Sequence, residues 1–467
     1  MPLSQVSSLS NQITNYKDAT QWIYDRIDYE RIRPRQTSTH FRLERVERLL
    51  TLIDSPQQKI PCVHIAGTKG KGSTAAILDS ILHESGVQTG LFTSPHIELF
   101  EERMRVGGQL PSPLQLVSMV NDLRQALADA PPEVVEDGPT YFEVATLLAW
   151  MYFDRQNVDL VVLETGLGGR LDCTNVCSPL LTIITTIGLD HTHILGDTIA
   201  KIAAEKAGIM KKGVPLLTWA SQPEVQEVFT EHAERLNCEV FRGDREILVD
   251  DDEPNGSFSV KSAWGNHPVL RLKLLGKHQK RNAALAVAAA DYLALLSAES
   301  SDPLADRLSG ITPKSIGAGL LAVEWPLRFE VIDDSPQIVL DAAHNPDSIA
   351  AFLATLNGFA EPARRRVLIF ASSHDKDSSA MLRKIIAQFD DVILTRFARN
   401  PRAIEPEELS QKVTEFHLKT RSGRPCSVFS SPAEALAMAK TLAGSDGIVC
   451  GTGSIFVAAE LRSLLIP

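Results

Sequence analysis

Short hydrophobic runs alternate with longer amphipathic stretches along the first part of the chain. Residues 60–66, 158–164 and 180–187 are apolar and rich in β-branched side chains, which predicts buried strands. The spacing of apolar residues predicts helices at about 73–85, 141–155, 198–210 and 222–236. Strands that alternate with helices in this way indicate a parallel sheet with helices on both faces.

The same alternation starts again near residue 326. Strand-like runs occupy 337–341, 366–371, 391–395 and 446–450. Helical patterns lie at about 346–358, 376–388, 405–415, 431–442 and 454–464. Glycine and proline interrupt the pattern between about 299 and 326. We therefore expect two α/β domains, a large one over 1–324 and a smaller Rossmann-like one over 325–467.

Composition narrows the class of protein. The 467 residues are 44% hydrophobic, which is enough for large cores, and the net charge of −11 argues against a general nucleic-acid binder. The six cysteines are scattered and favour reduced thiols. The first 20 residues lack the apolar region of a secretory signal, and Asp291 interrupts the apolar run 283–298. We expect a cytoplasmic protein without a membrane span.

The segment HIAGTKGKGST (64–74) carries the strongest chemical signal. It follows a predicted strand and opens a predicted helix, as a phosphate-binding loop does. Backbone N–H groups, the helix N-terminus and Lys71 would face the phosphates, although Gly72 separates Lys71 from Ser73 and breaks the strict pattern. A glycine-rich turn without a ligand is the alternative. The loop favours a P-loop-type ATPase for the larger domain.

A carboxylate ends the next predicted strand, in LETGLGGRLD (163–172). Glu164 at this position can hold Mg²⁺, which prefers oxygen ligands, or it can cap a tight turn. After the strand at 180–187 come His191 and His193, which would face opposite ways in an extended segment. A histidine is an unusual Mg²⁺ ligand, and Lys206 in the helix that follows has no signal of its own.

In the second domain, DAAHNPD (341–347) follows a predicted strand. Asp341 can accept hydrogen bonds from ribose hydroxyls, and His344 can stack on a base. The alternative is an Asx-turn that caps the helix starting at Pro346.

Together these segments resemble the folylpolyglutamate synthase/dihydrofolate synthase branch of the Mur ligase superfamily. The same motifs occur in that order in the family, from about residue 20 to the C-terminus: HIAGTKGKGST, TSPH (93–96), ETGLGGRLD (164–172), LDHT (189–192), EKAG (205–208) and DAAHNP (341–346). The resemblance implies a Mur-ligase-type ATP-binding domain and a Mur-ligase-type C-terminal domain.

The resemblance also implies a reaction. ATP phosphorylates the carboxylate of a folate or of dihydropteroate, and the amine of L-glutamate displaces phosphate from the acyl phosphate. These small molecules are the expected partners of a chain that we expect to be monomeric. Charge on the moving phosphoryl group must be neutralised, which suits Lys71, the loop N–H groups and Mg²⁺.

The family pattern assigns roles to residues of this chain. Ser94 and Glu164 hold one Mg²⁺, and Glu164, His191 and a carbamylated Lys206 hold a second. The catalytic residues are Lys71, Glu164, His191 and Lys206. The ATP-binding residues are Thr68, Lys69, Gly70, Lys71, Gly72, Ser73, Asn282, Arg328, Asp341 and His344. The pterin-binding residues are Thr140, Tyr141, Phe142, Glu143, Leu171, Asp172 and Cys173.

Some positions depart from the family pattern. Lys69 stands where asparagine is common, Cys173 where alanine is common, and Ala342 where glycine is common. None of these changes removes a predicted ligand.

Two other functions fit parts of the pattern. A Mur ligase acting on a UDP-linked cell-wall precursor would need an extra N-terminal domain, and the loop at Gly67 leaves too little chain before it. A non-catalytic nucleotide-binding protein would have lost Lys71, Glu164, His191 or Lys206, and all four are present.

Overall fold

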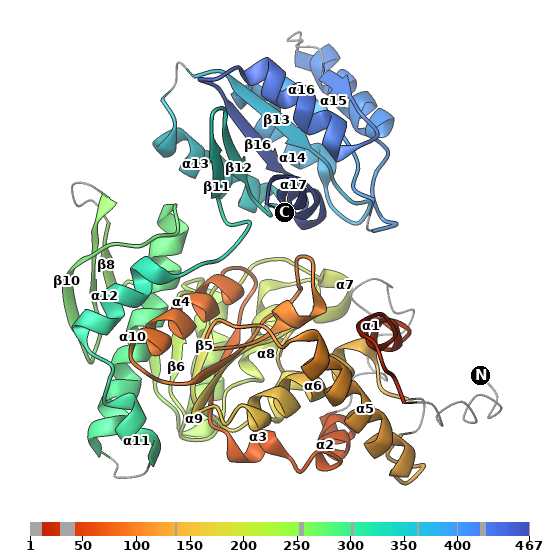
Figure 1. The fold of residues 1–467 in the computed structure, drawn as a ribbon. Helices are drawn as coiled ribbons and strands as arrows, with labels where there is room; N and C mark the ends of the chain where they lie inside the picture. The colour runs from red at the N-terminus through yellow and green to blue at the C-terminus, as the bar shows by residue number, and fades with distance from the viewer. Residues whose placement is uncertain are drawn as a thin grey trace. The chain divides into compact units, whose positions relative to one another are not determined.

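The computed structural model describes residues 12–28, 43–135, 138–251, 256–299, 303–361, 364–398, 400–420 and 426–466. The chain divides into two units, which are described separately (Figure 1). Unit 1 comprises residues 1–273 and 280–323, and unit 2 comprises 274–279 and 324–467. The change from unit 2 to unit 1 falls inside helix α10 (Lys277–Glu299).

Unit 1 is built on a seven-stranded sheet with the order β3-β2-β4-β1-β5-β6-β7. All neighbours are parallel except β2 and β3. The strands are β1 (Cys62–Ala66), β2 (Thr89–Phe92), β3 (Met104–Val106), β4 (Leu160–Glu164), β5 (Pro179–Ile184), β6 (Leu216–Thr218) and β7 (Val240–Arg242). Every residue of β1 and β4 is buried, as expected for central strands covered on both faces.

Helices and a small second sheet complete unit 1. The antiparallel sheet has the order β10-β9-β8, formed by β8 (Leu248–Asp250), β9 (Phe258–Lys261) and β10 (Asn266–Leu270). The helices besides α10 are α1 (Tyr16–Tyr24), α2 (Leu43–Thr51), α3 (Pro56–Lys59), α4 (Lys71–Glu84), η2 (Phe100–Arg103), α5 (Pro113–Asp129), α6 (Tyr141–Arg155), η3 (Cys173–Val176), α7 (Thr192–Leu195), α8 (Ile199–Ala207), α9 (Pro223–Leu236), α11 (Pro303–Leu308) and α12 (Pro313–Ala322).

Unit 2 is a smaller α/β sandwich. Its six-stranded sheet has the order β11-β12-β16-β13-β14-β15, and only the β11–β12 pair is antiparallel. Figure 1 shows β12, β16 and β13 side by side, with α16 over β13. The strands are β11 (Glu330–Asp334), β12 (Gln337–Leu340), β13 (Arg366–Phe370), β14 (Asp391–Leu394), β15 (Cys426–Val428) and β16 (Ile448–Thr452). The helices are α13 (Pro346–Phe359), α14 (Ser378–Ile385), η5 (Ile386–Gln388), α15 (Pro406–Thr420), α16 (Pro432–Ala443) and α17 (Ile455–Leu465).

The predicted α/β fold class is confirmed, and the predicted strands and helices are present with bounds shifted by a few residues. The glycine- and proline-rich stretch between the two predicted domains, 299–326, contains helices α11 and α12, because Pro303 and Pro313 occupy the first turn of each, where proline is favourable. Helix α12 packs against α4, and a Cβ at Gly319 would lie 2.4 Å from Ile81 Cα.

Each unit has its own hydrophobic core. In unit 1, Trp150, Phe153 and Phe92 lie in one cluster, and a second cluster surrounds Phe229. In unit 2, Phe352 and Leu368 lie in a further cluster. All six cysteines are free thiols, as the sequence predicts.

Candidate active site

The predicted phosphate loop joins β1 to α4 at the carboxyl edge of the unit 1 sheet. Gly70 precedes the helix with φ 87°, in the left-handed region that favours glycine. A Cβ there would lie 2.4 Å from Asn282 Oδ1, so the predicted adenine-contacting residue of α10 sits directly against the loop. Thr68 N donates to Thr186 O at 2.7 Å, and Lys69 N donates to Thr186 Oγ1 at 3.2 Å. The loop is thus fixed to the segment that follows β5.

Glu164 lies beside this loop at the carboxyl end of the neighbouring strand β4. Its side chain is 5% exposed. Oε2 accepts a hydrogen bond from Ser94 N at 3.2 Å, and Oε1 lies 3.8 Å from Lys71 Nζ. The fold therefore brings together Ser94, Glu164 and Lys71, which the sequence had placed on three separate segments.

Lys206 reaches the same loop from α8. It is 4% exposed, and its Nζ donates to Gly67 O at 2.9 Å. Burial, followed by the positive charge of Lys71, lowers the pKa of Lys206 to about 7, while nearby carboxylates including Asp190 oppose the shift. A substantial share of this amine is therefore neutral and nucleophilic near pH 7.

Close backbone packing positions α8 against the glycine-rich turn after Glu164. A Cβ at Gly169 would lie 2.8 Å from Glu205 O, and a Cβ at Gly208 would lie 2.5 Å from Arg170 Cα. Arg170 N donates to Glu205 O at 2.7 Å. One glycine on each side of the contact thus lets the turn and the helix approach closely, and this contact places Lys206.

His191 occupies a different conformation from the expected one. The expectation of an extended segment is wrong, because residues 192–195 form the helical turn α7, with His191 as its N-cap at φ 48°. The His191 side chain is 46% exposed, and the backbone N–H of His191 donates to the Asp190 carboxylate at 2.9 Å. The LDHT motif includes Asp190, but the sequence pattern assigns it no role; in the structure its charge acts on Lys206.

The four residues 140–143 differ in what their side chains contact. Thr140 and Glu143 form a capping box at the start of α6, and Glu143 Oε1 lies 3.3 Å from Arg45 Nε. Tyr141 is buried in the core. Phe142 is half-buried, and a Cβ at Gly166 would lie 2.4 Å from its ring. Phe142 is thus the member of this segment that lies over the glycine-rich turn.

The segment 171–173 is held by the Asp172 carboxylate. Asp172 is 5% exposed, and burial raises its pKa. Its Oδ2 accepts from Leu167 N at 2.7 Å, and its Oδ1 accepts from Thr174 N at 3.0 Å. Leu171 is half-buried and Cys173 is buried.

The predicted nucleotide-binding residues of unit 2 gather after β12. Asp341 accepts from Phe329 N and from Ala343 N, each at 2.8 Å, and burial raises its pKa to about 6 although Arg328 opposes the shift. His344 Nδ1 lies 2.9 Å from Ala342 O. The helix N-cap is Asn345, whose Oδ1 accepts from Ser348 N at 2.9 Å, so the Asx cap is present beside Asp341.

His278 joins this group and has no counterpart in the sequence prediction. Burial, followed by the charge of Arg328, lowers the pKa of His278 to about 4. A neutral imidazole therefore lies near Arg328 in unit 2. Only the tertiary structure reveals it, because His278 precedes Arg328 by 50 positions with no motif around it.

The donor set at the loop fits a hard metal ion. Within the described ranges, no cluster of three or more His, Cys, Asp or Glu side chains could hold a metal. The predicted ligands include only two such residues, Glu164 and His191, and draw the rest from a serine and a lysine. A buried carboxylate beside Ser94 is the kind of oxygen ligand that Mg²⁺ prefers.

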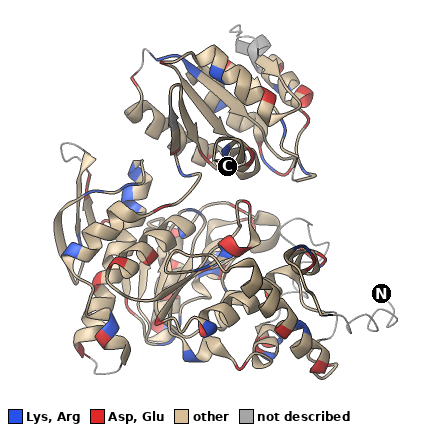
Figure 2. Ribbon diagram, viewed as in Figure 1, with Lys and Arg blue, Asp and Glu red and all other residues tan. Residues whose placement is uncertain are grey.

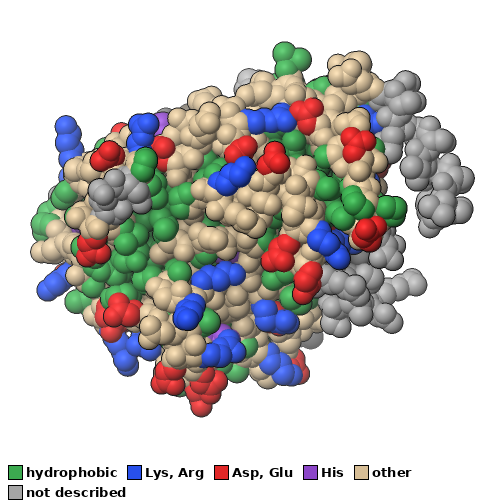
Figure 3. Space-filling view, turned by 90° about the horizontal axis from the view of Figure 1, so that it is seen from below, with side chains coloured by type: hydrophobic (Ala, Val, Ile, Leu, Met, Phe, Trp, Pro, Cys, Tyr) green, Lys and Arg blue, Asp and Glu red, His purple; other side chains and the backbone are tan. Residues whose placement is uncertain are grey.

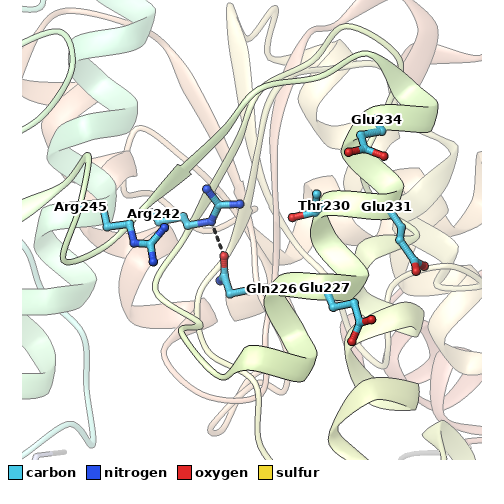
Figure 4. Close-up of a pocket in the computed structure, with 7 residues that line it drawn as sticks. All are labelled: Gln226, Glu227, Thr230, Glu231, Glu234, Arg242 and Arg245. Atoms are coloured by element: carbon cyan, nitrogen blue, oxygen red, sulfur yellow. Dashed lines mark hydrogen bonds between the residues drawn. The ribbon is translucent and has the colours of Figure 1, made fainter.

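A separate hollow of about 470 Å³ lies on α9 and β7 of unit 1. Figure 4 shows Glu227, Glu231 and Glu234 carried by α9, with Gln226 of the same helix hydrogen-bonded to Arg242. None of the predicted site residues lines this hollow.

Charge is distributed over both units. Figure 2 shows acidic and basic residues interspersed along the ribbons, and Figure 3 shows the two kinds mixed with hydrophobic side chains on one face. Positive charge near the phosphate loop is thus a local feature, carried by Lys71. Among the helices described, none is both long and apolar enough to cross a bilayer.

Comparisons with known proteins match most of the chain. Residues 65–290 match the Mur ligase middle domain, and residues 327–455 match the Mur ligase glutamate ligase domain. The dihydrofolate synthase/folylpolyglutamate synthase of Bacillus subtilis (strain 168) is 34% identical over 457 residues, which cover 97% of this chain and 99% of the relative.

Two solved structures have the same fold over nearly their whole length. The Mycobacterium tuberculosis folylpolyglutamate synthase complexed with ADP and AMPPCP aligns with a TM-score of 0.81 at 28% identity, over 98% of this chain and 99% of that one. Escherichia coli FolC in complex with DHPP and ADP aligns with a TM-score of 0.79 at 27% identity, over 97% and 98%.

Proposed function

The chain belongs to the folylpolyglutamate synthase/dihydrofolate synthase family of Mur ligases, and on this basis we propose that it adds L-glutamate to tetrahydrofolate, to its polyglutamates and to 7,8-dihydropteroate. It is an ATP-dependent amide ligase of folate metabolism. The observation that carries the proposal is the convergence of Lys71, Glu164, Ser94 and Lys206 at one phosphate loop.

The proposed reaction has two steps. A carboxylate oxygen of the acceptor forms a bond to the γ-phosphorus of ATP, the β,γ P–O bond breaks, and ADP leaves. The glutamate amine then forms the C–N bond, loses a proton, and phosphate leaves from the tetrahedral intermediate. Lys71 and the loop N–H groups stabilise the negative charge that develops on the transferred phosphoryl group.

Residues of both units would bind ATP. In unit 1 these are the loop residues and Asn282, which lies against Gly70. In unit 2, Arg328 would contact phosphate, Asp341 would accept from ribose hydroxyls, and His344 would lie near the nucleoside. The loop residues are Thr68, Lys69, Gly70, Lys71, Gly72 and Ser73.

Ser94 and Glu164 would hold one Mg²⁺, and Glu164, His191 and a carbamylated Lys206 would hold a second. Bound Mg²⁺ supplies positive charge to the phosphate oxygens. Carbamylation joins the neutral Lys206 amine to CO₂ with loss of a proton and converts a cation into an anionic oxygen ligand. A pKa near 7 favours this chemistry because much of the amine is unprotonated at neutral pH.

The acceptor would lie along the glycine-rich turn. Phe142 offers a ring face over Gly166, and the segment 171–173 continues from the same turn. Thr140, Tyr141 and Glu143 would contribute to this site through the start of α6. We further propose a monomeric enzyme that works in the cytoplasm on these small molecules.

A phosphate-release assay with ATP, Mg²⁺ and glutamate tests this function. We expect release with both 7,8-dihydropteroate and tetrahydrofolate monoglutamate as acceptors. Lys71→Ala should lower turnover by at least about 100-fold, because one full charge on the phosphoryl group is lost. Lys17→Ala, an exposed residue of α1, serves as the control. Wild-type turnover in a folded Lys71→Ala variant would contradict the role of the loop.

A further inference from the structure

Three polar side chains form a buried hydrogen-bond relay in unit 1. His64 lies in β1, Thr174 lies in η3, and Asp172 precedes η3. His64 Nε2 is 2.8 Å from Thr174 Oγ1, which is 2.5 Å from Asp172 Oδ1. The exposed fractions of the three residues are 0%, 0% and 5%. Polar groups this deeply buried must be hydrogen-bonded to one another to be tolerated.

The direction of each hydrogen bond follows from the number of protons. Asp172 accepts from Leu167 N and from Thr174 N, so its carboxylate is an acceptor. A threonine hydroxyl has a single proton. At 2.5 Å from Asp172 Oδ1, the Thr174 hydroxyl donates this proton in a hydrogen bond to the carboxylate. Thr174 Oγ1 can therefore only accept from His64. His64 Nε2 then carries a hydrogen atom and donates it to Thr174 Oγ1.

The relay fixes a segment that runs past the site. Leu167 lies in the glycine-rich turn after Glu164, so Asp172 holds both ends of the stretch 167–174. Asn175 Nδ2 donates to Arg170 O and to Gly208 O, each at 3.0 Å, and ties the same stretch to the end of α8. On the other side, His64 belongs to the strand that leads into the phosphate loop. The relay thus links that strand to residues 171–173.

We propose that His64 and Thr174 are positioning residues that hold Asp172 and the segment 171–173 in place for the acceptor substrate. This inference rests on the proposed function, since it takes the acceptor to lie along that segment. Neither His64 nor Thr174 is among the residues assigned to ATP binding. Their loss should therefore weaken acceptor binding more than ATP binding.

The variant Thr174→Val tests the relay because it keeps the shape of the side chain and removes the hydroxyl. It leaves His64 Nε2–H and one Asp172 lone pair without a partner. We expect the KM for 7,8-dihydropteroate and for tetrahydrofolate monoglutamate to rise about tenfold, and the KM for ATP to stay within about twofold. Thr174→Ser, which restores the hydroxyl, should return the acceptor KM to near the wild-type value.

Thr182→Val is the matched control. Thr182 lies on β5 and is also fully buried. Its hydroxyl donates to Pro215 O at 2.9 Å and does not belong to the relay. This variant should not change the acceptor KM. The relay is overturned if Thr174→Val leaves the acceptor KM unchanged, if it raises the ATP KM equally, or if Thr182→Val has the same effect.

A second pair of variants covers the case in which Thr174→Val does not fold. His64→Gln keeps an N–H donor at a similar distance from the backbone, whereas His64→Leu removes it, and only the latter should raise the acceptor KM. The ¹⁵N spectrum of histidine-labelled wild type should show His64 protonated at Nε2. Protonation at Nδ1 alone would overturn the relay. If wild-type enzyme releases no phosphate with either acceptor, the proposed function fails, whereas the spectrum still reports on the hydrogen bonds.

Discussion

At the scale of single residues, Lys206 is the most unusual group in the site. A lysine that is 4% exposed and lies near Lys71 faces both burial and like charge, and each disfavours its protonated form. Its Nζ donates to a backbone carbonyl, Gly67 O. A pKa of about 7 makes the protonation state of Lys206 sensitive to pH in the working range of most enzymes.

The neutral fraction of the Lys206 amine predicts how activity depends on pH. At a fixed CO₂ concentration, kcat/KM should rise between about pH 6 and pH 8, because the neutral amine that forms the carbamate becomes more abundant. Lys206→Ala should lower kcat by at least about 100-fold, and added acetate or propionate should restore part of it by supplying a carboxylate. Lys201→Ala on the same helix, where Lys201 is exposed and pairs with Asp197, should retain activity.

The lowered pKa of Lys206 also makes the free energy of unfolding depend on pH. The pKa of Lys206 is about 7 in the folded chain, against 10.5 for an ordinary lysine, so the unfolded chain binds more protons between these values. The free energy of unfolding should therefore rise with pH between about 7 and 10.5. Lys206→Met should reduce this slope in urea unfolding. An unchanged slope, or full activity of Lys206→Ala, would contradict the account of this residue.

Single residues differ in how far the sequence predicts them. Glu164 ends a predicted strand and Lys71 lies in the loop that follows another. Parallel sheets carry their sites at these ends, so pattern and chemistry point to both residues. Lys206 has no local signal, because its burial depends on a loop 139 positions away. His278 is similar, since only the fold brings it near Arg328.

At the scale of elements, the contact between the glycine-rich turn and α8 decides where Lys206 lies. Gly208 has φ −61°, so alanine has no backbone strain there, and only the contact with Arg170 opposes it. We expect Gly208→Ala to lower the free energy of unfolding by about 1 to 3 kcal/mol and to reduce kcat, because α8 must shift to accommodate the added methyl group. Chemical denaturation and the phosphate-release assay would measure the two effects.

Gly317→Ala is the control for that substitution. Gly317 lies inside α12, and a Cβ there would meet nothing within 4 Å. The change should stabilise the protein by about 0.5 to 1 kcal/mol, because alanine is the better helix former. If both variants are stabilised to the same extent and keep full activity, close packing at Gly208 does not place Lys206.

Elements with a strong periodic pattern were predictable, and short ones were not. The helix predicted at 141–155 has those bounds, because Thr140 and Glu143 provide a capping box before an apolar stretch. The three-residue strands β6 and β7 are too short to show a period. Strands β8 to β10 form a separate antiparallel sheet, which the alternation of strands and helices does not predict. The helical turn at His191 depends on one left-handed residue, which apolar spacing does not encode.

At the scale of the whole molecule, the two units have separate hydrophobic cores and separate sheets. Large chains with more than one core commonly unfold in more than one step, so a single midpoint is not a complete description of their stability. Leu368 is fully buried in β13 of unit 2, and Leu147 is fully buried in α6 of unit 1. These two leucines allow each core to be weakened on its own.

We expect calorimetry of the full chain without nucleotide to resolve two transitions. Leu368→Ala should shift the transition of unit 2 to lower temperature, and Leu147→Ala should shift that of unit 1. Each change should lower the free energy of unfolding of its unit by about 2 to 5 kcal/mol, because it leaves a cavity in one core. The double variant should show both losses in full, since distant sites in separate cores act independently. A single transition that either substitution lowers equally would show that the chain unfolds as one cooperative unit, and the division into two thermodynamic units would then be wrong.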